Sequence, residues 1–184
     1  MTTHAEPALA SIEPLGRIQY LQAVEHSLSC QLAEAIANRN LVLLLGATSR
    51  FGNWGLSTSA ALLLLAVRGP RVFAIFLAAT LIAVALQSGI KRLCRRVRPC
   101  HRPDGPPQRA PIPDQGSFPS GHTLHAVFAA AVMIALVPIA APFYVVVALL
   151  IAASRIVLGV HYPTDVLAGA VLGGLCALVV LALV

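Results

Sequence analysis

Residues 72–90 read VFAIFLAATLIAVALQSGI, a run without a charged residue that ends at the basic stretch KRLCRRVR of residues 91–98. A helix needs about 20 apolar residues, and at least about 17, to cross the hydrocarbon core of a bilayer. This run meets that length and is apolar on every side, which is typical of a helix that faces lipid tails. The stretch therefore predicts a membrane-spanning helix with a dense basic cluster at its end.

Four further apolar runs predict spans of the same kind. They are residues 54–67, 123–137, 143–158 and 166–184. The first of them is short, and residues from Gly52 and to Arg68 would complete it. Pro138 and Pro142 bracket a tight turn between two of the runs. We therefore expect an all-α, polytopic membrane helix bundle with about five transmembrane helices.

The sequence before these runs predicts a different organisation. Residues 1–16 are expected to form a flexible tail that is not a cleavable signal peptide. Residues 17–40 carry apolar side chains every three or four positions, which predicts an amphipathic helix at the membrane interface. The short apolar stretch 41–45 is interrupted by the polar residues 48–53, so we expect a partly embedded turn there. A single membrane-embedded domain would then cover residues 17–184.

The composition excludes an ordinary soluble domain. Of the 184 residues, 58% are hydrophobic and 11% are charged, and the mean hydropathy is +0.81, whereas soluble domains are about half apolar and about a quarter charged. The formal net charge is +6, but seven of the 13 Lys and Arg residues lie between Lys91 and Arg109. Because the positive charge is this local, we expect no nucleic-acid partner. The cluster is either an anchor to anionic headgroups or an anion site.

Polar clusters lie at the ends of three predicted spans, where ionisable residues are costly and usually functional. In the first cluster, Lys91 and Arg98 are seven positions apart, which on a continuing helix brings them to one face two turns apart. In the second, Ser120 and Gly121 precede His122 at the start of a span, where unpaired helix N–H groups bind anions. Taken singly, a membrane anchor and a plain helix cap remain the alternatives.

The third cluster surrounds the start of the last span. Pro163 suits the first helical turn, which places His161 just before the helix and Asp165 within its first turn. A carboxylate of Asp165 that accepts from one ring nitrogen of His161 would leave the other nitrogen facing a substrate as a nucleophile. A structural His–Asp pair is the alternative. Counting five spans puts all three clusters on one side of the bundle, together with the N-terminus.

Taken together, the clusters resemble the signature motifs of a known family. The motif residues are Lys91 with Arg98 and Pro99, then Pro119, Ser120, Gly121 and His122, then Ser154, Arg155, His161 and Asp165. They look like the three motifs of the type 2 phosphatidic acid phosphatase superfamily, in order and without a departure at any motif position. The motifs lie within residues 91–165, and the surrounding helix pattern is similar to the family's membrane core.

The resemblance implies a metal-independent lipid phosphatase that uses a phosphohistidine intermediate and no cofactor. His161 would attack the phosphorus, Asp165 would orient it, and His122 would protonate the leaving oxygen and later activate water. The phosphate would be held by Lys91, Arg98, Ser120, Gly121 and Arg155. Three of these residues are cations, which would supply the compensating charge in place of a metal ion.

Two other functions remain open at this point. A phosphotransferase on the same fold would pass the group to an alcohol, and a non-catalytic anion- or lipid-binding membrane protein would need only the cations. The expected substrate is a lipid phosphate: phosphatidic acid, phosphatidylglycerol phosphate, a polyprenyl phosphate or diphosphate, or a phosphoglycolipid. We expect a multi-pass protein of the cell inner membrane, surrounded by membrane lipids. The sequence leaves open which face carries the site, the oligomeric state, and whether Cys94 and Cys100 pair.

Overall fold

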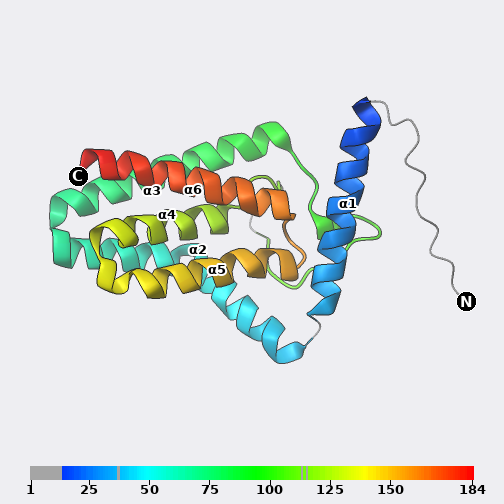
Figure 1. The fold of residues 1–184 in the computed structure, drawn as a ribbon, viewed down its shortest axis with the longest axis horizontal. Coiled ribbons are helices and arrows are strands. Elements are labelled where there is room, and N and C mark those ends of the chain that lie inside the picture. Colours follow the sequence, from blue (N-terminus) through cyan, green and yellow to red (C-terminus); the bar gives the residue numbers. More distant parts are fainter. Residues whose placement is uncertain (1–13, 37, 113, 115) are drawn as a thin grey trace, which may run out of the picture.

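The computed structural model describes residues 14–36, 38–112, 114 and 116–184. Its helices are α1 (Pro14–Ala35), α2 (Arg39–Arg68), α3 (Pro70–Cys94), α4 (Gly121–Leu136), α5 (Ala141–Val157) and α6 (Pro163–Leu183), with 3-10 turns at Pro99–His101 and Pro138–Ala140. Helices α2 to α6 run side by side as a bundle, and α1 lies across one end of it (Figure 1). The expected all-α helix bundle is confirmed.

The surface of the bundle is apolar over much of its length. Three stretches are long and apolar enough to span a membrane: Pro70–His101, which contains α3, Pro138–Val157, which contains α5, and Pro163–Leu183, which is α6. Two apolar helical stretches are shorter, namely Trp54–Arg68 within α2 and Gly121–Leu136, which is α4. Leu81, Ile82 and Leu167 are 63%, 66% and 64% exposed. Large apolar side chains that no protein covers fit a lipid-facing surface, so the chain is a membrane protein.

Helix α4 is the centre of the bundle and contacts α2, α3, α5 and α6. Its closest approach is to α6, because Gly169 and Gly173 of α6 face the α4 backbone. A Cβ atom at Gly169 would meet the carbonyl oxygen of Ser120, and one at Gly173 would meet that of Leu124. Small residues one turn apart let membrane helices pack backbone to backbone. This packing fixes the N-terminal end of α4, where the motif residues lie.

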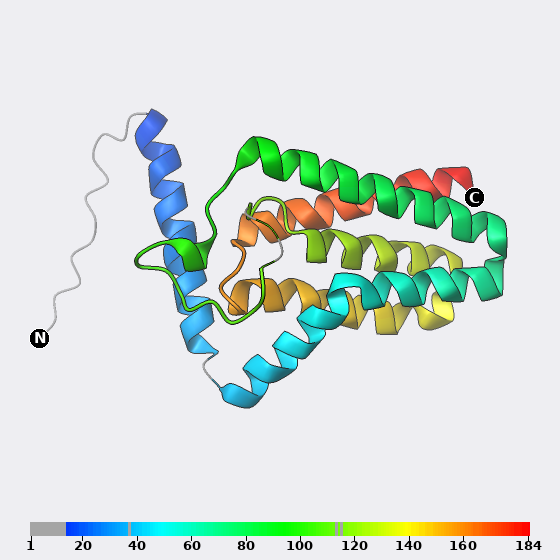
Figure 2. The same cartoon turned by 180° about the vertical axis from the view of Figure 1, so that it is seen from behind.

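Helix α2 differs from the expectation of a turn followed by a separate span. It is one helix of 30 residues, and Figure 2 shows it bending where its first half leaves the bundle. The polar residues 48–53 fit within it because some of them face the protein. Ser49 is buried and accepts a hydrogen bond from Arg155, and Gly52 packs against Ile151. The polar stretch therefore marks a surface that faces the site rather than a helix end.

Helix α1 lies at the end of the bundle that also carries the loops after α3 and α5 (Figures 1 and 2). Its Leu21, Val24 and Leu28 side chains are exposed, whereas His26 and Ser29 are buried. An exposed apolar side fits the predicted interfacial helix. The helix begins at Pro14, so the last residues of the expected tail are helical, and the rest of the tail lies outside the described residues.

Candidate active site

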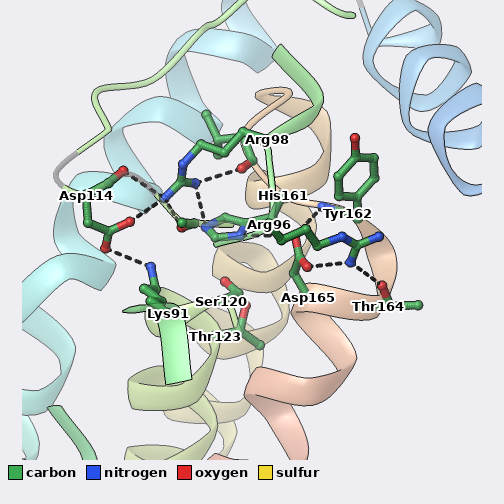
Figure 3. A network of polar contacts seen from close by, with 12 residues as sticks. Lys91, Arg96, Arg98, Asp114, Ser120, Thr123, His161, Tyr162, Thr164 and Asp165 are labelled. Carbon is green, nitrogen blue, oxygen red and sulfur yellow. Dashed lines mark hydrogen bonds and ion pairs between the residues drawn. The ribbon is translucent and has the colours of Figure 1, made fainter. Parts of the chain in front are cut away.

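The loop after α3 brings the first motif together. α3 ends at Cys94, and Arg95 adopts a left-handed backbone with φ 45° and ψ 32°, so the chain turns before it reaches Arg98. The expectation that Lys91 and Arg98 share one face of a continuing helix is therefore wrong. The two side chains still meet because both bind Asp114, at 2.7 Å from Lys91 Nζ and 2.6 Å from Arg98 Nη2 (Figure 3).

Asp114 was not among the residues predicted from the sequence, where it is one acidic residue in a proline-rich loop. Burial opposes its charge, but hydrogen bonds and charge interactions with Lys91 and Arg98 outweigh burial and lower the pKa of its carboxyl. Arg98 is 1% exposed and also donates to the backbone carbonyl oxygens of Gly116 and Val160, each at 2.8 Å. A carboxylate held between these two cations indicates that the cradle binds anions.

His161 is buried in the loop before α6, between Arg98 and Asp165. Its Nε2 atom lies 3.2 Å from Arg98 Nη1, and its Nδ1 atom lies 3.6 Å from Asp165 Oδ2. Because a guanidinium only donates, Nε2 is the acceptor and the ring proton lies on Nδ1, toward the carboxylate. Burial lowers the pKa of His161 to about 4; Asp165 opposes this, and the charges of Arg155 and Arg98 add to it. The imidazole is therefore neutral at neutral pH.

Asp165 is held through both carboxylate oxygens. Oδ1 accepts from Arg96 Nη1 at 2.6 Å, and Oδ2 accepts from the backbone N–H of Tyr162 at 2.9 Å. Arg96 also pairs with Glu25 of α1 at 2.5 Å, and its guanidinium carbon lies 4.2 Å from the centre of the Tyr162 ring, a cation–π contact. Sequence reasoning missed Arg96 and Glu25, because Arg96 is one of several arginines after α3 and no motif points to α1.

A cavity of about 80 Å³ lies between these elements. Six of the eight predicted site residues line it: Lys91, Arg98, Gly121, His122, Arg155 and His161. Of the other two, Asp165 lies against the Nδ1 side of His161. The hydroxyl of Ser120 lies 3.0 Å from Thr123 Oγ1, and its backbone N–H donates to the carbonyl oxygen of Asp165. A phosphate contact by Ser120 stays a prediction.

Arg155 and the start of α4 give the cavity unpaired donors. Arg155 is 1% exposed, its Nη1 donates to Ser49 Oγ, and its Nε is a buried donor without a partner among the described residues. Gly121 is the first residue of α4, where backbone N–H groups lack helical partners. Such groups, together with a guanidinium, favour binding of a phosphate oxygen.

Among the residues that the structure describes, no group of three or more His, Cys, Asp and Glu side chains is placed to hold a metal ion. Independence of a metal ion nevertheless stays a prediction about the chemistry. All four cysteines are free thiols, so Cys94 and Cys100 do not pair.

The chain is similar to known proteins over most of its length. Residues 72–184 match the family described as the PAP2 superfamily. The chain is 34% identical over 168 residues to a decaprenylphosphoryl-5-phosphoribose phosphatase of Mycobacterium tuberculosis, covering 90% of this chain and 89% of the relative. A phosphatase of the same name from Mycolicibacterium smegmatis is 44% identical over 85 residues, covering 44% of this chain and 42% of that one.

The fold is shared with two solved structures. A transmembrane PAP2-type phosphatidylglycerolphosphate phosphatase from Bacillus subtilis has a TM-score of 0.73 at 24% identity and covers 89% of this chain and 86% of its own. LpxE from Aquifex aeolicus has a TM-score of 0.71 at 24% identity, with coverage of 83% and 92%. Because the family match spans more than half of the chain and its motif residues gather at one site, the protein belongs to the PAP2 superfamily.

Proposed function

We propose that this protein hydrolyses a lipid-linked phosphate through a phosphohistidine on His161, without a metal ion. The chain is a lipid phosphatase of its family. The observation that supports it most directly is the neutral, buried His161 ring, which lines the cavity and lies with its Nε2 atom 3.2 Å from Arg98 Nη1. The Nε2 lone pair accepts from Arg98 in this structure, and it becomes the nucleophile when that guanidinium donates to a phosphate oxygen of the bound substrate instead.

In the first step, Nε2 of His161 attacks the phosphorus, and a P–N bond forms while the P–O bond to the leaving alcohol breaks. His122, which lines the same cavity, gives its proton to the leaving oxygen, so the lipid product departs as an alcohol. Lys91, Arg98 and Arg155 balance the charge on the three equatorial oxygens.

In the second step, His122 is neutral and takes a proton from a water molecule. The water oxygen attacks the phosphorus, the P–N bond breaks, and inorganic phosphate leaves. Asp165 faces the Nδ1 proton of His161 at 3.6 Å and stabilises the positive charge that the ring carries while it is phosphorylated.

The substrate that we propose is a phosphoglycolipid with a terminal phosphomonoester. The relative that matches 90% of this chain is named for a decaprenylphosphoryl-linked phosphoribose, which favours this class among the lipid phosphates considered from the sequence. The cell inner membrane, where such lipids are accessible to an embedded site, is the proposed location. Phosphate release in the presence of an added alcohol separates hydrolysis from transfer, because a phosphotransferase would give the alkyl phosphate instead.

The two histidines provide the test of the mechanism. His161→Ala is expected to abolish turnover and any acid-labile phosphoenzyme, because it removes the atom that takes the phosphoryl group. His122→Ala is expected to slow turnover of an alkyl phosphate about 10²–10⁴-fold. An aryl phosphate with an acidic phenol needs no proton on its leaving oxygen, so it should restore part of the first step in His122→Ala and none in His161→Ala.

Rapid quench with ³²P-labelled substrate would measure both the burst and the trapped phosphoenzyme. His122→Ala is expected to accumulate phosphohistidine, since water activation in the second step is also lost. A phosphoenzyme in His161→Ala that is absent from His122→Ala would assign the nucleophile to His122 and refute the proposal.

A further inference from the structure

A second cavity of about 310 Å³ adjoins the catalytic one, a volume within the usual range of ligand sites. His122 and Arg155 line both cavities. In the proposed mechanism His122 protonates the leaving oxygen, so this oxygen lies beside His122, which lines both cavities. The second cavity is therefore positioned to hold the part of the substrate that is attached to the departing oxygen.

The walls of this second cavity are basic. They include Arg50 of α2 and Arg109 of the loop before α4, besides Arg155, and none of the described residues that line it is acidic. Arg109 is fixed by bonds to the carbonyl oxygens of Ala33 and Ile36, at 2.6 and 3.3 Å. Among the described residues no carboxylate forms an ion pair with Arg50. A concave site with uncompensated positive charge favours an anionic ligand.

One face of α2 connects the two cavities. Arg50 lines the basic cavity and Trp54 lines the catalytic one, and residues four positions apart lie on the same side of a helix. Trp54 is 57% exposed, which leaves its ring open toward lipid. A substrate lying along this face would place its terminal phosphate beside His161 and a second anionic group beside Arg50.

Resting on the proposed function, we propose that the basic cavity binds a phosphodiester within the leaving group of the substrate. The preferred substrate class is then a lipid whose phosphorylated sugar or polyol headgroup is joined to its chain by a phosphodiester. Arg50 is the residue that determines this preference. A lipid phosphate without that second anion would still react at His161, but it would bind less tightly.

Two synthetic substrates with the same prenyl chain and the same phosphorylated pentose test this proposal. In one the pentose is joined to the chain through a phosphodiester, and in the other through a neutral glycosidic bond. In neutral detergent micelles, kcat/KM of the unchanged protein is expected to be about tenfold or more higher for the phosphodiester substrate, from one charge-assisted contact. Arg50→Gln should raise KM for the phosphodiester substrate alone. Arg71→Gln, which changes an exposed arginine at the other end of the bundle, should leave KM for both substrates unchanged.

Equal kcat/KM for the two substrates, or an equal loss for both in Arg50→Gln, would refute the phosphodiester site and leave the proposed function intact. Failure of the unchanged protein to release phosphate from either substrate would refute the proposed function together with this site. Neutral micelles contain no anionic lipids. If Arg50 only anchored the protein to anionic headgroups, Arg50→Gln would leave KM for both substrates unchanged in these micelles, and the phosphodiester site would be refuted.

Arg96 and Glu25 lie behind the pair formed by His161 and Asp165. The Arg96 guanidinium links Asp165 Oδ1, at 2.6 Å, to Glu25 of α1, at 2.5 Å. Glu25 also accepts from the backbone N–H of Thr164, at 2.8 Å. Glu25 and Arg96 thus bind the first turn of α6 from two sides, and neither lines the catalytic cavity. We infer that Arg96 and Glu25 are positioning residues that hold Asp165 in its orientation toward His161.

A double-mutant cycle tests this role. Arg96→Gln is expected to lower kcat about tenfold or more with KM nearly unchanged, because it acts on Asp165 and not on the substrate. In an Asp165→Asn background the same change should cost little more, since coupled residues are not additive. Arg96→Lys should restore part of kcat, and Arg92→Gln, an exposed arginine one turn earlier, should be neutral. Additive losses, or a rise in KM without a fall in kcat, would refute the positioning role.

Discussion

At the scale of single residues, the carboxylate of Asp114 bridges two cations of the site. Lys91 and Arg98 both bind Asp114, at 2.7 and 2.6 Å, so the charge that would otherwise repel within the cradle is offset before substrate arrives. The phosphoryl oxygens need the same donors. Asp114 therefore positions the two cations and also competes with phosphate oxygens for their N–H groups. A substitution at Asp114 measures which of these two effects is larger.

Replacing Asp114 with Asn is expected to strengthen binding of phosphate analogues, because the competing charge is removed while the shape is kept. We expect the inhibition constant of vanadate, and KM for substrate, to fall by up to about tenfold. Asp104→Asn is the matched control, because Asp104 lies in the same loop but pairs with His26, at 3.2 Å. Weaker vanadate inhibition in Asp114→Asn would mean that the carboxylate mainly orients the cations.

The buried His161 ring makes stability depend on pH with a definite sign. Its pKa is about 4 in the folded protein and about 6.5 in an unfolded chain. Between these values the unfolded state binds the extra proton, so the stability that the neutral ring contributes is present above pH 6.5 and is lost as the pH falls toward 4. In detergent, the melting temperature should fall less between pH 7 and pH 5 for His161→Gln than for the unchanged protein. Equal falls would contradict the conclusion that His161 is buried in its neutral form.

At the scale of helices, the apolar runs were sufficient to predict α3, α5 and α6, and Pro163 predicted the start of α6. The contacts that set helix spacing are less visible in the sequence. Gly169, Gly173 and Gly174 all lie in α6, and only the structure shows which of them face α4. Gly173 lies against the backbone of Leu124, whereas nothing lies within 4 Å of a Cβ atom built at Gly174.

This difference gives a pair of matched substitutions. Gly173→Ala is expected to destabilise the fold by about 1–3 kcal/mol, because the added methyl group forces α6 away from α4. Gly174→Ala should be neutral or stabilising by up to about 1 kcal/mol, because alanine is the better helix former and its methyl group has room. Thermal unfolding in one detergent measures both. Equal melting temperatures for the two variants would show that α4 and α6 are not packed backbone to backbone.

At the scale of the whole molecule, the order of the helices explains why the site could be predicted in outline. Counting spans places the loops after α3 and α5 at one end, and the structure confirms this. Contacts between distant segments could not be predicted in the same way. Arg96 and Glu25 are 71 positions apart, and Asp114 reaches Lys91 across 23 positions. No period or motif spacing encodes such pairs, since they depend on how loops fold over the bundle end.

At the same scale, positive charge exceeds negative charge around the catalytic cavity. Lys91, Arg98 and Arg155 converge on one cavity from α3, the following loop and α5, so a phosphate dianion meets three positive charges offset by one carboxylate. We expect this surplus to stabilise the transition state without a metal ion. Activity in detergent should therefore be unchanged by EDTA, and vanadate should compete with substrate, because its trigonal bipyramidal adduct on His161 resembles the transition state. Loss of turnover with EDTA that Mg²⁺ or Zn²⁺ restores would show that these three cations are insufficient and that a metal ion completes the site.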